Sequence, residues 1–410
     1  MHSSIHRLFT RHSKRDNTPA AGNRNRARYG ALLLAGLLAA GCSSMPPLQR
    51  SDVDIAPLLH DEAFPGAAAH AVESPDEVFD LGDDARNYLD QNINSIRDFY
   101  NRGEALIDEI FHQAALNLSY ESTANTTASE TFHSRAANCL SLSILTYSMA
   151  EYVGFDARFQ EVDIPEYWER RENFSLMAQH VNLLLKPKTS NSTRLLKRSL
   201  EVDFLSPVNN RRYAVRAISK SRALAMFYNN KGVDALLAGN SGAAYAYLKA
   251  ALLEDHTLDM AMTNLGLLYR NQGHLDWAET SHRLAISIND DNLLSAESLA
   301  MLMKKTGRQE EADAILARLE RKRQSSPYYH YIQGEEAYDA GDWGTAIRFF
   351  RKAISLKPDA DEFYFGLAKS YVQLGDQDRA QSYLRKAERH ASFTDTKERY
   401  RTKITALSEL

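Results

Sequence analysis

The sequence predicts an α+β domain followed by an all-α solenoid built from helix pairs. Two observations carry this prediction. In the C-terminal half, small residues recur every 34 positions, as they do in arrays of stacked helix pairs. Before that array, a cysteine stands at the start of a helical segment, and segments with the alternating pattern of β-strands follow it. A leader that is first basic and then apolar precedes both units.

The first 41 residues have the composition of a secretory signal. Residues 1–30 hold seven basic residues and one acidic residue, and an apolar run from Ala31 to Ala40 follows. Such a run is too short to span a membrane as a stable helix but is typical of a signal peptide. The segment Leu37-Leu38-Ala39-Ala40-Gly41-Cys42 resembles the bacterial lipobox, in which the cysteine is acylated and becomes the first mature residue. The resemblance implies a signal peptide over residues 1–41 and a lipoprotein carrying palmitate on Cys42.

The residue after the cysteine and the charge of the mature chain bear on location and partners. In many Gram-negative lipoproteins an aspartate at this place retains the protein in the inner membrane, so Ser43 implies an outer-membrane protein facing the periplasm. Without the leader, 42 basic residues stand against 52 acidic ones. A chain this acidic is a poor candidate for binding nucleic acid or anionic lipid. We therefore expect no nucleic-acid partner and membrane attachment through acyl chains alone.

Residues 42–80 are predicted to form a flexible tether. Polar residues dominate this stretch, and it contains the prolines Pro46, Pro47, Pro57, Pro65 and Pro75. Helical periodicity begins near Asp83 and opens a domain that we expect over residues 81–220.

One helix of this domain begins at a cysteine. Asn138 is a good N-cap and Gly154 a good stop, so the segment between them is predicted to be one helix with Cys139 in its first turn. The positive end of a helix stabilises an anion, which favours the nucleophilic thiolate form of a cysteine. Strand periodicity follows, with four candidate strands at residues 157–162, 179–185, 200–204 and 213–216.

A helix headed by cysteine, then a strand with histidine and a strand with aspartate, resembles the transglutaminase-like superfamily, which has a papain-type fold. The resemblance rests on the segments Asn138-Cys139, Gln179-His180-Val181 and Val202-Asp203. It implies that Cys139 is a nucleophile, that His180 is the base that activates it, and that Asp203 orients the imidazole. Ala137 departs from the glycine that many relatives carry, and no obvious glutamine or tryptophan precedes Cys139 to complete an oxyanion hole.

Each of these residues also has a purely structural interpretation. His180 alternates with apolar neighbours and fits a core histidine, and Cys139 fits a small apolar residue in a helix core. Asp203 fits a strand end or an ion pair with Arg212. His133 is a second candidate base, although it lies only six residues before Cys139.

The C-terminal half carries four sets of small residues in one 34-residue register. The sets are Gly232, Gly266, Ala300, Gly334 and Ala368; Gly239, Gly273, Gly307, Gly341 and Gly375; Ala244, Ala278, Ala312, Ala346 and Ala380; and Ala251, Ala285, Leu319, Ala353 and Ala387. This pattern resembles the tetratricopeptide repeat, a helix–turn–helix unit whose copies stack into a solenoid. We expect five repeats over residues 225–393 and a capping helix over residues 394–410.

In this repeat family the first helix of each unit lines a concave groove. By register, we expect that groove to contain Asn229, Thr263, Arg270, Asn271, Lys304, Lys305, Tyr328, Tyr331, Glu335 and Asp339. Arg270, Asn271, Lys304, Tyr328 and Tyr331 are the candidate contacts to an extended peptide or a partner helix. The alternative is a solvated groove with no dedicated ligand.

These features together favour a membrane-tethered enzyme that transfers acyl groups through a cysteine. Hydrolysis of a peptide or amide bond is the simplest such reaction, with the repeats recruiting a protein partner or substrate. The alternative is a non-catalytic envelope scaffold, and the sequence does not name the substrate or decide between water and an amine as acceptor. We expect no cofactor and no metal, because the 13 histidines show no metal-ligand spacing and no phosphate-binding glycine loop is present.

Overall fold

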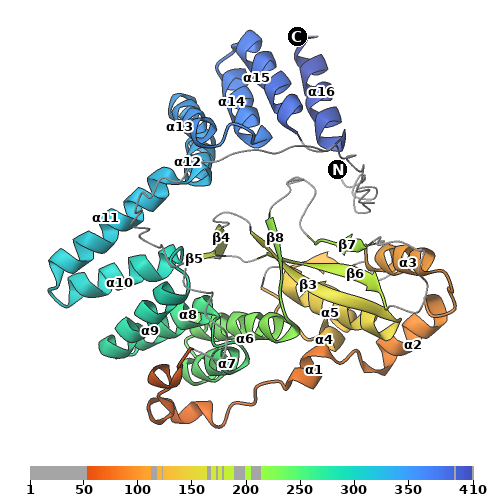
Figure 1. The fold of residues 1–410 in the computed structure, drawn as a ribbon, viewed down its shortest axis with the longest axis vertical. Helices are drawn as coiled ribbons and strands as arrows, with labels where there is room; N and C mark the ends of the chain where they lie inside the picture. The colour runs from red at the N-terminus through yellow and green to blue at the C-terminus, as the bar shows by residue number, and fades with distance from the viewer. Residues whose placement is uncertain are drawn as a thin grey trace, which may run out of the picture.

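The computed structural model describes residues 53–111, 118–121, 123–163, 168–171, 174–177, 180–188, 199–204, 214–391 and 394–408 (Figure 1). The predicted signal peptide, Cys42 and Arg212 lie outside these residues. Figure 1 shows an α/β domain with a curved array of helices along one side. No helix in the described part of the chain is both long and apolar enough to cross a bilayer.

The α/β domain is built around a four-stranded antiparallel sheet in the order β7-β6-β3-β8. Its strands are β3 (Phe155–Asp163), β6 (His180–Pro187), β7 (Leu200–Val202) and β8 (Ala214–Ala217). Two smaller pairs are β1 (Ser119–Tyr120) with β2 (Ala136–Ala137) and β4 (Trp168–Arg171) with β5 (Phe174–Met177). The helices are α1 (Pro75–Phe79), α2 (Gly82–Asn92), α3 (Phe99–Phe111), α4 (Ala128–Ser134) and α5 (Cys139–Tyr152). The four main strands lie at the segments that the alternating pattern predicts.

Helix α5 is the central helix of this domain. The side chain of Asn138 accepts a hydrogen bond from the amide of Ser141 at 2.9 Å, and Gly154 ends the segment with a φ of 93°. Apolar and small hydroxyl residues cover all sides of α5 because it is enclosed by its surroundings, including β3 and β6. The hydroxyl of Ser143 bonds to the carbonyl of Val181 in β6 at 3.1 Å. The predicted helix between Asn138 and Gly154 is confirmed.

The helical array consists of five antiparallel pairs and a last single helix. The pairs are α6 (Lys220–Leu237) with α7 (Ser241–Glu254), α8 (Asp259–Asn271) with α9 (Leu275–Ile288), α10 (Leu293–Lys305) with α11 (Gln309–Ser325), α12 (Pro327–Asp339) with α13 (Trp343–Leu356), and α14 (Asp361–Gln373) with α15 (Gln377–His390). Helix α16 (Thr394–Ser408) packs on α15, where the sequence predicts a capping helix.

The 34-residue register has a direct structural meaning. The glycine that follows the first helix of each pair has a positive φ, between 74° at Gly239 and 87° at Gly273, which favours glycine at this turn. The small residues of the other sets are buried between helices. A Cβ atom added at Gly334 would lie 2.6 Å from the ring of Phe350, and one added at Gly366 would lie 2.7 Å from it. Phe350 therefore fits between two helices only because both positions lack a side chain.

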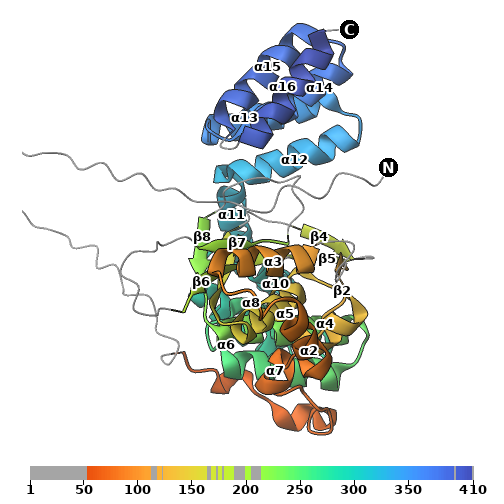
Figure 2. The same ribbon diagram turned by 90° about the vertical axis from the view of Figure 1, so that its right-hand side faces the viewer.

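The array divides into two parts by its packing. The buried apolar residues of the α/β domain and of repeats 1 and 2 form one continuous cluster that reaches Leu302 in α10. Helices α12–α16 have separate clusters, and Figures 1 and 2 show them standing away from the sheet beyond α11. Repeats 1 and 2 thus belong to the core of the α/β domain, whereas repeats 4 and 5 have cores of their own.

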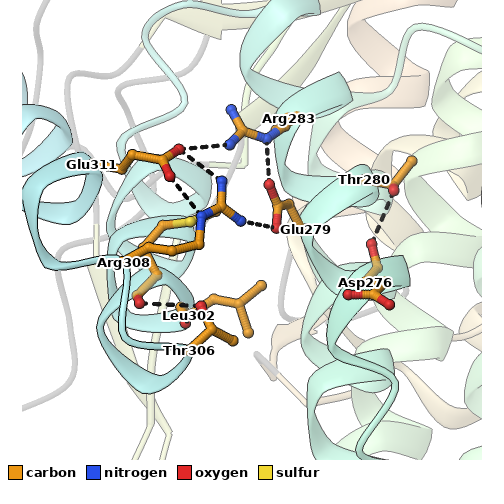
Figure 3. Close-up of polar contacts among 9 residues, drawn as sticks. Asp276, Glu279, Thr280, Arg283, Leu302, Thr306, Arg308 and Glu311 are labelled. Atoms are coloured by element: carbon orange, nitrogen blue, oxygen red, sulfur yellow. Dashed lines mark hydrogen bonds and ion pairs between the residues drawn. The ribbon is translucent and has the colours of Figure 1, made fainter.

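A charged cluster joins repeats 2 and 3 at the surface (Figure 3). Arg308 contacts Glu279 of α9 and Glu311 of α11, each at 2.6 Å, and Arg283 contacts Glu279 at 2.8 Å. The hydrogen bond from Arg308 holds the pKa of Glu311 below its usual value. Exposed pairs of this kind add little stability individually and contribute more when several charges form a network.

Residues 53–73, which we call the strap, differ from the predicted flexible tether. They include three short 3-10 helices, η2 (Ala56–Leu58), η3 (Asp61–Ala63) and η4 (Pro65–Ala67), and lie against α7 and α9 (Figure 1). Val53, Ile55, Leu58 and Phe64 are buried in the main apolar cluster. The prolines that suggested an open tether instead begin turns, since Pro57 lies in η2 and Pro65 starts η4.

The strap binds an aromatic surface of repeats 1 and 2. The ring of Phe64 stacks on Tyr245 with centroids 4.5 Å apart, and that of His60 stacks on Trp277 at 3.8 Å. The hydroxyl of Tyr269 donates to the carbonyl of Leu58 at 2.5 Å. The repeats therefore already hold one extended segment of their own chain.

Candidate functional site

Strand order brings the three predicted catalytic residues to one end of the sheet. Helix α5 reverses at Val153-Gly154 into β3, so its N-terminus with Cys139 lies near the far end of β3. Strand β6 runs antiparallel to β3, and its first residue, His180, pairs with Val162 at that same end. Strand β7 returns antiparallel to β6, so Asp203, just after its last residue, also arrives there.

The histidine and the aspartate are in direct contact. The Nε2 atom of His180 lies 2.6 Å from Oδ1 of Asp203, and the His180 side chain is only 4% exposed. Burial lowers the pKa of His180, but hydrogen bonds with Asp203 and with Cys139, and the electrostatic attraction of both groups, raise it from 6.5 to about 9. Cys139 is a free thiol and is half-buried. The imidazole thus contacts a carboxylate, and Cys139 contributes with that carboxylate to its raised pKa.

The second candidate base, His133, is held elsewhere. It lies exposed on α4, with Nε2 at 3.1 Å from Asp84 and Nδ1 at 2.7 Å from the carbonyl of Ser129. The bonds with Ser129 and Asp84 raise the pKa of His133. This histidine joins α4 to α2, and the described contacts give it no part in the group around Cys139.

Sequence reasoning missed the amide side chains that support Cys139. Asn138, the N-cap of α5, donates from Nδ2 to Oδ1 of Asn125, and Asn125 donates from its own Nδ2 to Asp234 of α6. Both asparagines are buried. Only the capping role of Asn138 has a sequence signal, because the other two bonds join residues 13 and 109 positions apart, beyond the reach of a local pattern.

Ion pairs attach the first repeat to the same end of the sheet. Arg222 of α6 is buried, with Nη1 at 3.0 Å from Asp255 and Nε at 3.6 Å from Glu161 of β3. Glu161 is the neighbour of Val162, which pairs with His180, and it also bonds to Arg216 of β8 at 2.5 Å. The first repeat is therefore held next to the strand end that carries His180.

The predicted groove residues have different surroundings. Asn271 and Lys304 are exposed, and Arg270 is half-buried. Tyr328 and Tyr331 are half-buried as well, because both rings pack on Phe363 and Tyr331 also contacts Phe350. The hydroxyl of Tyr328 accepts a hydrogen bond from Lys357 at 2.9 Å.

Two other residues of the expected groove are buried. Thr263 has no exposed surface and bonds to Ser295 at 2.7 Å, and Asn229 accepts from Asn264 at 2.8 Å. Neither can line an open groove, and that expectation is corrected. They lie instead in a polar layer between successive first helices.

A metal site does not form among the described residues. No group of three or more histidine, cysteine, aspartate or glutamate side chains in the described ranges is arranged to hold an ion.

Comparison with known proteins bears on the helical array. The family model of the tetratricopeptide repeat matches residues 337–394. The C-terminal part of this chain contains tetratricopeptide repeats. Tetratricopeptide repeat protein 16 of Macaca fascicularis is 38% identical over 58 residues, and that of Homo sapiens is 36% identical over 58 residues. Each match covers 14% of this chain and 7% of the relative, so the chain spans a small fraction of these proteins.

Solved structures similar to the tetratricopeptide repeats include MamA and YrrB. A MamA structure is 21% identical, covering 41% of this chain and 91% of that one, with a TM-score of 0.23. MamA from Desulfovibrio magneticus RS-1 is 17% identical, covering 40% and 94%, also with a TM-score of 0.23. YrrB, described as a TPR protein with an unusual peptide-binding site, is 16% identical, covering 43% and 92%, with a TM-score of 0.23. Tetratricopeptide repeats are modules for protein–protein interaction.

Proposed function

We propose that this protein is a cysteine-dependent acyl-transfer enzyme of the transglutaminase-like, papain-type class, tethered to a membrane by lipid on Cys42. The observation that supports this most is the position of His180, a buried imidazole whose Nε2 lies 2.6 Å from Asp203 and whose pKa is raised by both Asp203 and Cys139. A histidine that only fills space in the core needs neither a carboxylate nor a thiol beside its ring. The chain order of the three groups also matches the order of the resemblance.

The chemistry follows from these three groups. His180 takes the proton of the Cys139 thiol, and the sulfur attacks the carbonyl carbon of an amide or peptide bond. Asp203 stabilises the imidazolium that results and keeps the ring in place. His180 then gives its proton to the leaving amine, which departs and leaves a thioester on Cys139. Water or a second amine, deprotonated by His180, attacks the thioester and restores the thiol.

The start of α5 supplies a place for the developing negative charge. The first amides of a helix have no partner within it, and they point beyond the helix end. Cys139 is the first residue of α5, so an oxyanion formed on its substrate lies near these amides and the positive end of the helix dipole. In this proposal the helix amides take the role of the glutamine or tryptophan that does not obviously precede Cys139 in the sequence.

We assign the tetratricopeptide repeats to recruitment of the substrate or of a protein partner. Figure 1 shows the array curving around the side of the α/β domain that carries β4 and β5. These strands lie between β3 and β6 in the chain, so they connect to the end of the sheet that carries His180. Asn271 and Lys304 are exposed and are the candidate contacts for such a partner.

Alkylation of Cys139 tests the catalytic proposal. In a Cys42→Ser background Cys139 is the only thiol. It should react with iodoacetamide faster than free cysteine does, because the imidazolium of His180 stabilises the thiolate. His180→Ala should slow the reaction by about tenfold, equivalent to about 1.4 kcal/mol of lost ion-pair stabilisation, and Asp203→Asn should slow it less.

The matched control for this experiment is His133→Ala, which removes the exposed histidine and should leave the alkylation rate unchanged. A wild-type rate no faster than that of free cysteine, and unaffected by His180→Ala, would exclude the enzyme. The non-catalytic envelope scaffold, with the tetratricopeptide repeats as its binding surface, would then be the better assignment.

The lipid anchor has a separate test. Cys42→Ala should abolish incorporation of labelled palmitate and block cleavage of the leader, because the acylated side chain and the cleavage site are lost together. Cys139→Ala is the control and should retain full label. Undiminished label in Cys42→Ala would contradict the lipoprotein, and separation of inner from outer membranes would test the proposed outer-membrane location.

A further inference from the structure

A chain of hydrogen bonds connects the first repeat to the start of α5. A carboxylate oxygen of Asp234 in α6 accepts from Nδ2 of Asn125, and Oδ1 of Asn125 accepts from Nδ2 of Asn138. Oδ1 of Asn138 accepts from the amide of Ser141 at 2.9 Å and so caps α5. The last bond fixes the helix turn that contains Cys139.

The carboxylate of Asp234 sets the donor-to-acceptor direction of the whole chain of hydrogen bonds. An asparagine side chain can donate through its nitrogen or accept through its oxygen, and only its partners decide which way it is turned. An ionised aspartate can only accept, so Asn125 must turn its nitrogen toward Asp234 and its oxygen toward Asn138. Asn138 must then donate to Asn125, which leaves its oxygen for the helix amide. Asp234 thus selects the orientation that an N-cap requires.

Because the two asparagines are buried, the loss of a partner in this chain of hydrogen bonds is costly. Asn125 is 8% exposed and Asn138 is 5% exposed, so water can hardly replace a lost partner. The surrounding backbone is tied to the same turn. The amide of Asn138 donates to the carbonyl of Ala124 at 3.0 Å, and the amide of Thr126 donates to the hydroxyl of Ser141 at 2.9 Å.

We propose that Asp234 is a positioning residue for Cys139, acting through Asn125 and Asn138 to hold the first turn of α5 against His180. This proposal rests on the proposed function for the role of Cys139, but the hydrogen-bond chain itself does not. Asp234 lies near the C-terminal end of the first helix of the tetratricopeptide repeats. The geometry of the nucleophile therefore depends on the first repeat, and the repeats are a part of the enzyme site as well as a binding module.

Two substitutions separate the hydrogen bond from the bulk of the side chain. In the full chain carrying Cys42→Ser, Asp234→Ala removes the acceptor, whereas Asp234→Asn keeps an oxygen that can accept from Asn125. Asp276→Ala is the matched control, because Asp276 is an exposed acid on α9 of the second repeat. The readouts are the rate of Cys139 alkylation and the hydrogen exchange of a peptide covering the first turn of α5.

Asp234→Ala should speed exchange of the first-turn amides and slow alkylation, each by about fivefold, which is the typical effect of losing a helix cap. Asp234→Asn should give a measurable but smaller loss than Asp234→Ala in both readouts, because it retains an acceptor but can also donate, and so no longer excludes the reverse orientation of Asn125. Asp276→Ala should change neither. If Asp234→Ala fails to fold, Asp234→Asn alone tests the proposal, because the loss of an accept-only carboxylate should still slow alkylation and speed exchange relative to the parent.

Unchanged exchange and alkylation in Asp234→Ala, or in Asp234→Asn where the alanine variant does not fold, would overturn the positioning role. Failure of the proposed function looks different. In that case His180→Ala leaves the alkylation rate of the parent unchanged, while the exchange measurements still report on the link from Asp234 to α5.

Discussion

Leu58→Ala is expected to lower the free energy of unfolding by about 3 kcal/mol, the usual cost of removing a fully buried leucine side chain from a packed core. Leu58 has no exposed surface and belongs to the cluster shared by the α/β domain and the first two repeats. Its carbonyl also accepts from Tyr269 of α8. Urea unfolding followed by circular dichroism would measure the loss.

Leu253 in α7 provides the matched control, since 56% of it is exposed and Leu253→Ala should change stability by less than about 0.5 kcal/mol. Hydrogen exchange over residues 53–73 would show whether the strap opens alone before the rest of the chain. A change in Leu58→Ala as small as in Leu253→Ala, with strap amides exchanging as fast as a free peptide, would show that the strap is the flexible tether that the sequence predicts.

The pair formed by His180 and Asp203 should make stability depend on pH. The pKa of His180 is raised in the folded protein from 6.5 to about 9, so the folded state binds the proton more tightly than the unfolded chain. The stabilisation is fully present below pH 6.5 and is lost as pH rises through about 9. Its size is on the order of 3 kcal/mol, because each unit of pKa shift corresponds to about 1.4 kcal/mol.

Urea unfolding at a series of pH values from 6 to about 10 would measure this decline. His180→Gln should flatten the profile in that window, since it removes the titrating group. His133→Gln should leave most of the decline in place, because His133 is exposed on α4. A wild-type profile that is flat, or that rises, across the window would contradict a charged His180 paired with Asp203.

The sequence predicts secondary structure well where local rules decide it. The turn glycines of the repeats recur in register because a positive φ is needed at each turn. Asn138 and Gly154 bound α5 because capping depends on residues within a few positions of the helix end. The candidate site residues could be predicted for the same reason, since Cys139, His180 and Asp203 each lie at the start or end of a recognisable element.

Contacts between segments that lie far apart in the chain are not predictable from local sequence pattern. The strap looks like a tether, because Pro57, Pro65 and their polar neighbours give no periodicity. Two of its hydrogen bonds to α7 and one to α8 join residues 184 to 211 positions apart along the chain, and a ring contact reaches α9. Tyr328 and Tyr331 have the register of groove residues, yet the approach of Phe363 from the next repeat turns both rings into packing contacts. The repeat register predicts which face of a helix a residue occupies, but not which side chains of neighbouring helices cover that face.

By itself, therefore, the sequence determined the repeats, the helix that carries Cys139 and the order of the three candidate catalytic groups, because spacing and capping act over a few residues. Only the tertiary structure decided that His180 meets Asp203, that the strap lies on repeats 1 and 2, and that Asp234 orients the cap of α5. These depend on contacts between segments from 23 to 211 positions apart. Such contacts form when strand pairing and burial place the segments together, and no local pattern encodes them.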